Sequence, residues 1–249
     1  MNQFLDHRPR RRILPLLLLG VAGLLACVAI GVAIESGSEP RGPKVFTPPA
    51  AIPGPGSVTG VDSTGSPAPG LTGPLQLVRG ERLVNGVQLG FPHSTVGAVS
   101  AAVEYWRQLG STLEPDRAAA VARLVAVDSW SSAADDLAKG PVATRKGLGL
   151  PQSGQLQPGV SVVLSPIEYQ VRSVGPDNVQ VLLLSTYTTS VPGTGMHTRM
   201  GVYPLDLTWS ANDWRIPAPS GNSTTDYTSL VAEPGSPQAS AKGWQELKR

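Results

Sequence analysis

Residues 208–216 read TWSANDWRI, and this short stretch decides how the second half of the chain folds. Trp209 and Trp214 lie at equal distances from the central residues 210–213, which are rich in turn-forming side chains. The spacing predicts a β-hairpin in which the two indoles form a cross-strand pair. Such a pair fixes the register of the last two strands.

The sequence predicts two further antiparallel strands before this hairpin, whose own first strand is long. In residues 160–172, Val163, Ile167, Tyr169 and Val171 alternate with Glu168, Gln170 and Arg172, which indicates a half-buried strand. Pro166 marks an edge or a bulge of that strand. Residues 174–178 form a turn into a central strand at 179–189, because residues 181–184 are continuously apolar, and a third strand covers residues 196–209.

The residues before the strands are expected to be helical. After a short hairpin at 83–89 with an Asn85-Gly86 turn, a helix begins at Ser94 or Thr95 and ends at Gly110. A second helix begins at Pro115, and a third runs from Asp128 to Lys139, ended by Gly140-Pro141 and followed by a loop to residue 159. In the first helix, one face is predicted to be buried (Val96, Val99, Val103, Trp106) and the other to face solvent (Ser100, Glu104, Arg107, Gln108). Helices followed by antiparallel strands predict an α+β domain, with N-terminal helices packed on one face of a curved, cone-like sheet.

The N-terminus contains a long uncharged run, ILPLLLLGVAGLLACVAIGVAI, at residues 13–34. A helix that crosses a bilayer needs about 20 apolar residues, and the arginines at positions 10–12 favour a cytoplasmic N-terminus. The sequence therefore predicts a single-pass membrane protein with an extracytoplasmic C-terminal domain. A cleaved signal peptide and a lipoprotein acylated at Cys27 are the alternatives.

These patterns divide the chain into five parts. We expect a cytoplasmic stub at 1–12, a transmembrane helix at 13–34, a disordered linker at 35–73, the α+β domain at 74–217 and a flexible tail at 218–249. The linker contains eight prolines and eight glycines, which is typical of chains that do not fold. Trp244 is the one residue of the tail that could dock back onto the domain.

The charge and cysteine content exclude several functions. Beyond residue 34 the chain carries 16 basic and 17 acidic side chains, so the predicted outer part has no basic field for a nucleic acid. Cys27 is the only cysteine and lies in the predicted membrane helix, which leaves the outer part without a disulfide or a reactive thiol.

The motif search predicts no catalytic, cofactor-binding or metal-binding residues, so the chain is not expected to be an enzyme. It lacks G-x-S-x-G, S-x-x-K, H-E-x-x-H, the P-loop and a complete G-x-G-x-x-G. His93 is expected to have a structural role near a helix N-terminus. His197 is expected near Tyr187, Tyr203 and Glu168 in a sheet cavity, where proton transfer is conceivable.

Three helices followed by a meander that ends in the pattern W-x-x-x-D-W-x-h, where h is apolar, resemble the nuclear transport factor 2-like superfamily. With one N-terminal anchor, the chain resembles the bitopic membrane assembly subunits of type IV secretion and conjugation systems. Residues 86–94 (GVQLGFPHS) and 98–102 (AVSAA) look like membrane proteins of actinobacterial conjugative elements.

This resemblance implies a non-enzymatic scaffold that binds other envelope components, or copies of itself, outside the membrane. No binding residue can be assigned to this chain from the resemblance, because its motifs are short and describe only the fold. Two alternatives remain open, an accessory membrane protein of a lipid importer and an isomerase- or dehydratase-like enzyme that uses the cone cavity. The enzyme would need an inward acid–base pair, for which only His197, Glu168 and Asp206 qualify.

Overall fold

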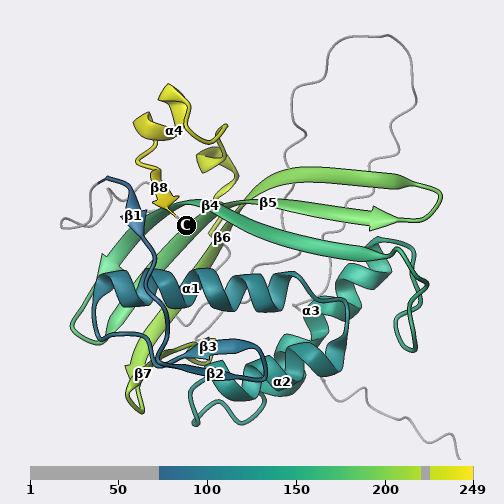
Figure 1. The fold of residues 1–249 in the computed structure, drawn as a ribbon, viewed down its shortest axis with the longest axis horizontal. Coiled ribbons are helices and arrows are strands. Elements are labelled where there is room, and N and C mark those ends of the chain that lie inside the picture. The colour runs from purple at the N-terminus through teal and green to yellow at the C-terminus, as the bar shows by residue number, and fades with distance from the viewer. Residues whose placement is uncertain (1–72, 220–224, 249) are drawn as a thin grey trace, which may run out of the picture.

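The computed structural model describes residues 73–219 and 225–248, which form helices packed against a curled, mostly antiparallel sheet (Figure 1). The predicted α+β class is confirmed. The predicted membrane helix at 13–34 and nearly all of the predicted linker lie outside the described residues. Within those residues, we find no helix with the length and apolarity to cross a bilayer. The helices are α1 (Thr95–Gly110), α2 (Pro115–Val125), α3 (Ala133–Gly147) and the short α4 (Pro237–Ala241), with a 3₁₀ turn, η1, at Thr228–Leu230.

The six-stranded sheet has the order β1-β8-β4-β5-β6-β7, and a separate hairpin pairs β2 with β3. The meander β4–β5–β6–β7 is antiparallel throughout, whereas β1 runs parallel to β8. The strand bounds are β1 Leu75–Gln76, β2 Arg82–Val84, β3 Val87–Leu89, β4 Ser161–Val174, β5 Asn178–Val191, β6 Gly195–Ser210, β7 Asp213–Arg215 and β8 Gln245–Lys248.

The tryptophan hairpin forms as its sequence predicts. Trp209 pairs with Trp214, and their rings meet edge to face with centroids 5.4 Å apart. Ala211 and Asn212 have φ angles of 51° and 59°, as in the type I′ turns that suit the twist of a hairpin.

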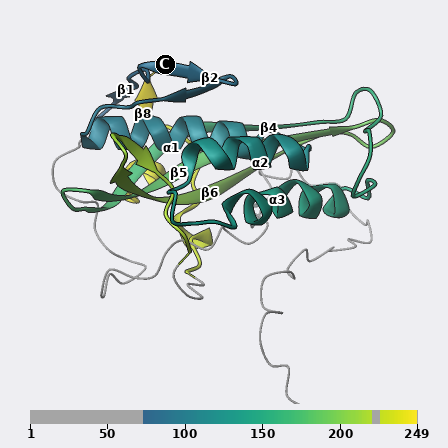
Figure 2. The same ribbon diagram turned by 90° about the horizontal axis from the view of Figure 1, so that it is seen from below.

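Helix α1 runs across the sheet, with contacts to β4, β5, β6 and β7 (Figures 1 and 2). Ser94 caps it by accepting a hydrogen bond from the Gly97 N–H, and its predicted apolar face is largely buried. The prediction that Ser100 and Glu104 face solvent is wrong. Both are buried because the segment from β1 to β3 covers that side of the helix, where Ser100 Oγ accepts from the Val78 N–H and Glu104 Oε1 from the Gln88 N–H.

Helix α3 does not end at Gly140-Pro141, as the sequence suggested, but continues to Gly147 with Pro141 inside it. Proline disfavours the helical conformation of the preceding residue largely through a clash with its Cβ, and Gly140 has no Cβ. The extra turns place Arg145 in the protein interior, where its side chain is 1% exposed. The loop before β4 is correspondingly shorter than predicted.

The predicted faces of β4 are wrong before Pro166, whereas after it Tyr169 and Val171 are buried as predicted but Glu168 and Gln170 are not exposed. Before the proline, Val162 and Leu164 are buried while Val163 is 47% exposed. A register shift between Pro166 and Glu168 confirms the predicted bulge, and a bulge moves the following side chains to new positions on the sheet. Beyond it, Glu168 and Gln170 are buried as well as Tyr169 and Val171, so that part of the strand is covered on both faces.

The cover on the second face comes from the C-terminal segment, so the prediction of a flexible tail is wrong for residues 225–248. Strand β8 pairs with β4, and η1 and α4 lie over the opposite face of the sheet from α1 (Figure 1). Trp244 docks as anticipated, and its indole N–H donates to Leu230 O (2.8 Å). This second core is a small cluster of Leu182, Leu184, Val202, Ala232, Ala239 and Trp244.

We predict that Trp214→Ala destabilises the protein more than Trp209→Ala. Trp214 is 1% exposed, whereas Trp209 is only partly buried, so removal of the first indole leaves the larger cavity. The Trp214 change should lower the free energy of unfolding by about 3–5 kcal/mol. Denaturant unfolding of a chain that retains residues 225–248 measures this, and equal losses for the two variants would contradict it.

Candidate functional site

The carboxylate of Asp213 joins the tryptophan hairpin to the loop that precedes α1. It is 1% exposed and accepts hydrogen bonds from the N–H groups of Gly90 (2.6 Å), Phe91 (3.0 Å) and Trp214 (2.9 Å). Three charge-assisted bonds replace the water that a buried carboxylate loses. The Asp213 carboxylate therefore has a structural role, because it holds the hairpin against this loop.

The residues around Asp213 complete this junction. Trp214 donates its indole N–H to Pro92 O (2.9 Å), and Tyr105 of α1 donates its hydroxyl to Trp214 O (2.7 Å). Burial raises the pKa of the Tyr105 phenol, and the nearby Asp213 carboxylate raises it further. The phenol therefore stays a neutral hydrogen-bond donor.

His93 lies on the outer side of this junction. Its ring stacks on Trp209 with centroids 4.1 Å apart, and its Nε2 lies 2.9 Å from Pro176 O and 3.1 Å from Asp177 Oδ1. The side chain thus links the start of α1 to the β4–β5 turn, an arrangement consistent with the structural role that the sequence suggested.

The predicted cavity around His197 does not form. His197 is exposed on β6, and its Nε2 lies 2.9 Å from Thr194 O in the adjacent turn. Glu168 is buried under the C-terminal segment and accepts from the Gly235 N–H (2.7 Å). Tyr187 and Tyr203 lie on the sheet face that carries α1. The predicted cavity was wrong because the alternation of apolar and polar side chains does not show how far a strand extends beyond the core.

Asp206, the third residue considered for acid–base chemistry, lies with Glu168 on the C-terminal side of the sheet. Its Oδ1 accepts from Gln180 Nε2 (2.9 Å), and burial raises its pKa above the usual range of a carboxyl group. The structure therefore does not bring His197, Glu168 and Asp206 into one inward-facing set.

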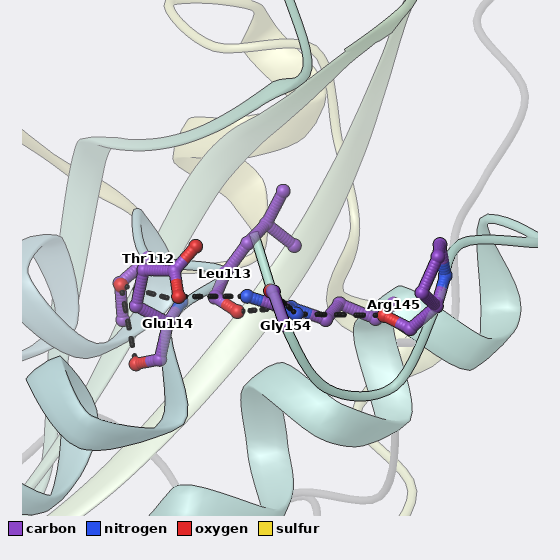
Figure 3. A network of polar contacts seen from close by, with 6 residues as sticks. Thr112, Leu113, Glu114, Arg145 and Gly154 are labelled. Carbon is purple, nitrogen blue, oxygen red and sulfur yellow. Dashed lines mark hydrogen bonds and ion pairs between the residues drawn. The ribbon is translucent and has the colours of Figure 1, made fainter. Parts of the chain in front are cut away.

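Arg145 forms a buried polar network that the sequence analysis missed, because it ended α3 too early (Figure 3). Its guanidinium donates to Leu113 O (2.6 Å) and Gly154 O (2.8 Å) and forms an ion pair with Glu114 (2.7 Å). These contacts tie the α1–α2 loop to the loop after α3. Arg145 thus fixes two loops.

Two hydroxyl groups are enclosed between α1 and the sheet. Ser185 and Tyr203 are buried, and neither side-chain oxygen has a hydrogen-bond partner among the described residues. The Tyr203 ring packs edge to face on Trp106 (5.3 Å), and burial together with nearby Tyr187 raises the pKa of its phenol. Tyr203 belongs to the main apolar core, so these two hydroxyls lie in a mainly apolar interior.

A shallow groove of about 480 Å³ lies at the corner formed by β1, β8 and β4. Its two charged lining residues, Glu246 and Lys248, have opposite signs. No group of three potential metal ligands occurs in residues 73–219 and 225–248. The groove has no net charge with which to recognise an ionic ligand.

The remaining candidate is a sheet surface that the C-terminal segment leaves uncovered. Past Leu184 and Val202, strands β4, β5 and β6 continue as a three-stranded arm (Figure 1). Every second residue of each strand in this arm lies on the same face as the second core, and on that face the hydroxyls of Thr188 and Thr198 lie 3.0 Å apart across two strands. We call this surface the hydroxyl face; it consists of Ser161, Val163, Ser165, Thr186, Thr188, Ser190, Met196 and Thr198, all partly or fully exposed and none charged.

The hydroxyl face could have been suspected from the sequence. Residues 178–205 contain no aspartate or glutamate, and Arg199 is their only lysine or arginine. An exposed strand region with so little charge differs from an ordinary solvated surface. The arrangement can bind an uncharged or extended partner.

The fold and this surface define the chain as an α+β protein that presents an exposed sheet arm. Residues 47–235 match the family described as a domain of unknown function, DUF8175, and the chain belongs to this family. Comparison with curated proteins and with solved structures finds no match.

We predict that Asp213→Asn lowers the free energy of unfolding by about 3 kcal/mol. The asparagine side chain of the variant has only one acceptor oxygen. Its NH₂ group would therefore face a backbone N–H group that donates to the Asp213 carboxylate in the wild type. Asp128→Asn is the control, because its carboxylate is 89% exposed and surface changes usually stay within about 0.5 kcal/mol. Equal unfolding midpoints for the two variants would refute the role of Asp213.

Asp206 generates a pH-dependent prediction. Because its pKa is raised in the folded state, the folded protein binds more protons than the unfolded chain just above pH 4. Its contribution to stability is therefore greatest below the unfolded pKa and falls as pH rises through the folded pKa. Asp206→Asn removes this loss, so the variant should gain in melting temperature over the wild type as the pH rises above about 4. A difference in melting temperature that does not change with pH would show that the Asp206 carboxyl group is not desolvated.

Proposed function

We propose that the protein is a non-enzymatic, membrane-anchored scaffold that works by protein–protein association outside the membrane, as a subunit of a conjugation or type IV secretion-like machine. The observation that carries this proposal is the hydroxyl face. On the face away from α1, three strands extend beyond the C-terminal segment and present an uncharged surface that the fold itself does not use. Such a surface suits a macromolecular partner better than a small polar substrate.

The buried charges support the same conclusion. Asp213, Arg145 and Glu168 are each bonded to main-chain groups that hold loops in place. A catalytic acid or base must instead reach a substrate. The charged residues most able to do chemistry are therefore engaged in maintaining the fold.

The predicted anchor at 13–34 and the linker that follows fit this function. Tethering at a membrane raises the effective concentration of weakly bound partners, so modest contacts through the arm would suffice. The resemblance to bitopic assembly subunits and the curled sheet, which suits the cone-like fold of that resemblance, support the same class of protein.

The enclosed hydroxyls of Ser185 and Tyr203 are the observation that favours the alternative, a cone-cavity enzyme. Ser185→Ala and Tyr203→Phe remove these hydroxyls while nearly preserving the volume of each side chain. In the scaffold proposal, both variants keep full biological function. Loss of function in a folded variant would favour the enzyme, and genomic neighbours that encode a lipid importer would favour the other alternative.

Site-specific photo-cross-linking in the native membrane tests the scaffold proposal. A photoreactive residue at Thr188, on the hydroxyl face, should cross-link the full-length protein to other envelope components. The matched control is Arg123, an exposed residue of α2 on another side of the domain. Cross-links at Arg123 but not at Thr188, or full DNA transfer by a Thr188→Glu variant, would contradict the assignment of this face.

A further inference from the structure

Strand β6 has a free edge in the arm. It pairs with β5 along its length, whereas on its other side β7 pairs only with residues 208–210. No other strand in the described part of the chain pairs with residues 195–207 of β6. An unpaired edge of this kind presents main-chain donors and acceptors to which another strand can bind.

Two hydrogen bonds show which main-chain groups point outward from this edge. Trp209 N–H donates to Asp177 O on the β5 side, whereas Pro204 O accepts from the Trp106 indole on the opposite side. Because main-chain direction alternates along a strand, the even-numbered residues of β6 project their N–H and C=O groups away from β5. In the arm these residues are Met196, Thr198 and Met200.

The accessible part of the edge is short. Residues 195–199 are exposed and Met200 is partly exposed, whereas residues 201–203 are buried. Pro204 has no N–H to offer at the next outward position. A strand that binds here therefore lies opposite Gly195–Met200.

The outward residues of this edge read the same in both directions. In an antiparallel pair of two copies with a two-fold axis at Thr198, this threonine lies opposite its own copy, and Met196 lies opposite Met200 of the second copy. All three outward positions then exchange main-chain hydrogen bonds across the axis, about six in total. This is the self-complementarity that a two-fold symmetric interface requires.

The side chains on the edge favour a second copy as the occupant. Met196 is 72% exposed, whereas Met200 packs against the second core. In the pairing about Thr198, Met196 packs on Met200 of the second copy, so the exposed methionine extends that core across the axis. None of these three side chains is charged, so no like charges meet on this face.

The other face of the strand is compatible with the same register. There His197 lies opposite Arg199 of the second copy, because these positions are equally far from Thr198. Neither side chain is paired directly with its own copy. The pairing ends at two copies, because the same edge of each copy is used by the other.

We propose that a second copy of this protein binds the β6 edge at Gly195–Met200 by antiparallel strand pairing about a two-fold axis at Thr198. The two hydroxyl faces then lie side by side on one continuous sheet. The inference rests on the proposed function, association outside the membrane, and names a second copy of the chain as one partner.

The size of this contact connects it to the predicted membrane anchor. One short strand from each copy makes an interface of the small class, below about 1,200 Å², whose complexes are weak. In dilute solution the copies therefore separate and the edge stays open. Two anchors in one membrane hold the edges at a high effective concentration, at which a weak contact suffices.

Disulfide cross-linking in the native membrane tests the position of the axis. The full-length Cys27→Ser protein contains no other cysteine. In that background Thr198→Cys places a cysteine opposite its own copy, and oxidation should give a covalent dimer. The matched control is Thr188→Cys, on the same face but one strand further from the axis, where the two copies lie about 14 Å apart and should not cross-link. Equal yields at the two positions, or no dimer through position 198, would overturn the proposal.

A second pair of cysteines tests the register of the two strands. A Met196→Cys chain co-expressed with a Met200→Cys chain should form a mixed dimer. The Met196→Cys chain alone should not form one, because its two cysteines would lie roughly 13 Å apart along the strands. A Met196→Cys dimer that forms as readily as the mixed dimer would overturn pairing about Thr198.

Two substitutions at Thr198 test whether main-chain hydrogen bonds hold the dimer. Both are introduced into the co-expressed Met196→Cys and Met200→Cys chains. Thr198→Pro removes the outward N–H, whereas Thr198→Val keeps it and removes the same hydroxyl contact with Thr188. Proline should reduce the yield of mixed dimer by about tenfold, and valine by less than about twofold. Equal reductions would overturn strand pairing, and the comparison of positions 198 and 188 decides the matter if the proline variant does not fold.

The outcomes separate this inference from the proposed function. Photo-cross-links from Thr188 to other envelope components, without a dimer through position 198, would leave the scaffold standing while this inference falls. A dimer through position 198 without those cross-links would support self-pairing and contradict a place in a larger machine. Oxidation that joins the Thr198→Cys protein mainly to a different envelope protein would assign the edge to that protein and overturn self-pairing.

Discussion

The buried carboxylate of Asp213 is the interaction on which the arrangement of the two layers depends. A buried carboxylate without donors is very costly, so three main-chain N–H groups must converge on it. Two of them belong to Gly90 and Phe91, far away in sequence. The carboxylate thereby fixes where the chain leaves the β2–β3 hairpin and enters α1.

The close packing at this junction explains the small residues around it. A Cβ atom at Gly97 would collide with the carbonyl group of Pro92, whose oxygen also accepts the Trp214 indole N–H. Gly90 has a φ angle of 77°, which few other residues adopt without strain. With its first turn held at β7, α1 crosses the sheet toward β4, and the core forms beneath it.

Covering the second face of the sheet sets the limit of the stable domain. Leu182 and Leu184 point away from α1, and the C-terminal segment buries them while β8 pairs with β4. The segment stops short of the outer ends of β4, β5 and β6. The C-terminal segment covers the apolar part of the sheet face opposite α1, and the arm is the part of that face that it leaves uncovered.

Local patterns in the sequence were sufficient for features that depend on neighbouring residues. The tryptophan hairpin, the Asn85-Gly86 turn and the first two helix starts are set by nearby side chains and were predicted correctly. Residues 181–184 already indicated a central strand, but the sequence did not show that Trp244 and its neighbours cover its second face. Features that depend on distant partners were missed, as the burial of Glu104 and Arg145 and the separation of His197 from Glu168 show.

Amide hydrogen exchange tests the central claim that Asp213 locks the junction while the arm edge stays open. The N–H groups of Gly90, Phe91 and Trp214 should exchange only through global unfolding. The N–H groups of Met196 and Thr198, which point outward on β6, should exchange orders of magnitude faster than the N–H of Leu183 in the middle of β5. Protection at Thr198 equal to that at Leu183, or rapid exchange at Gly90 and Phe91, would contradict the account.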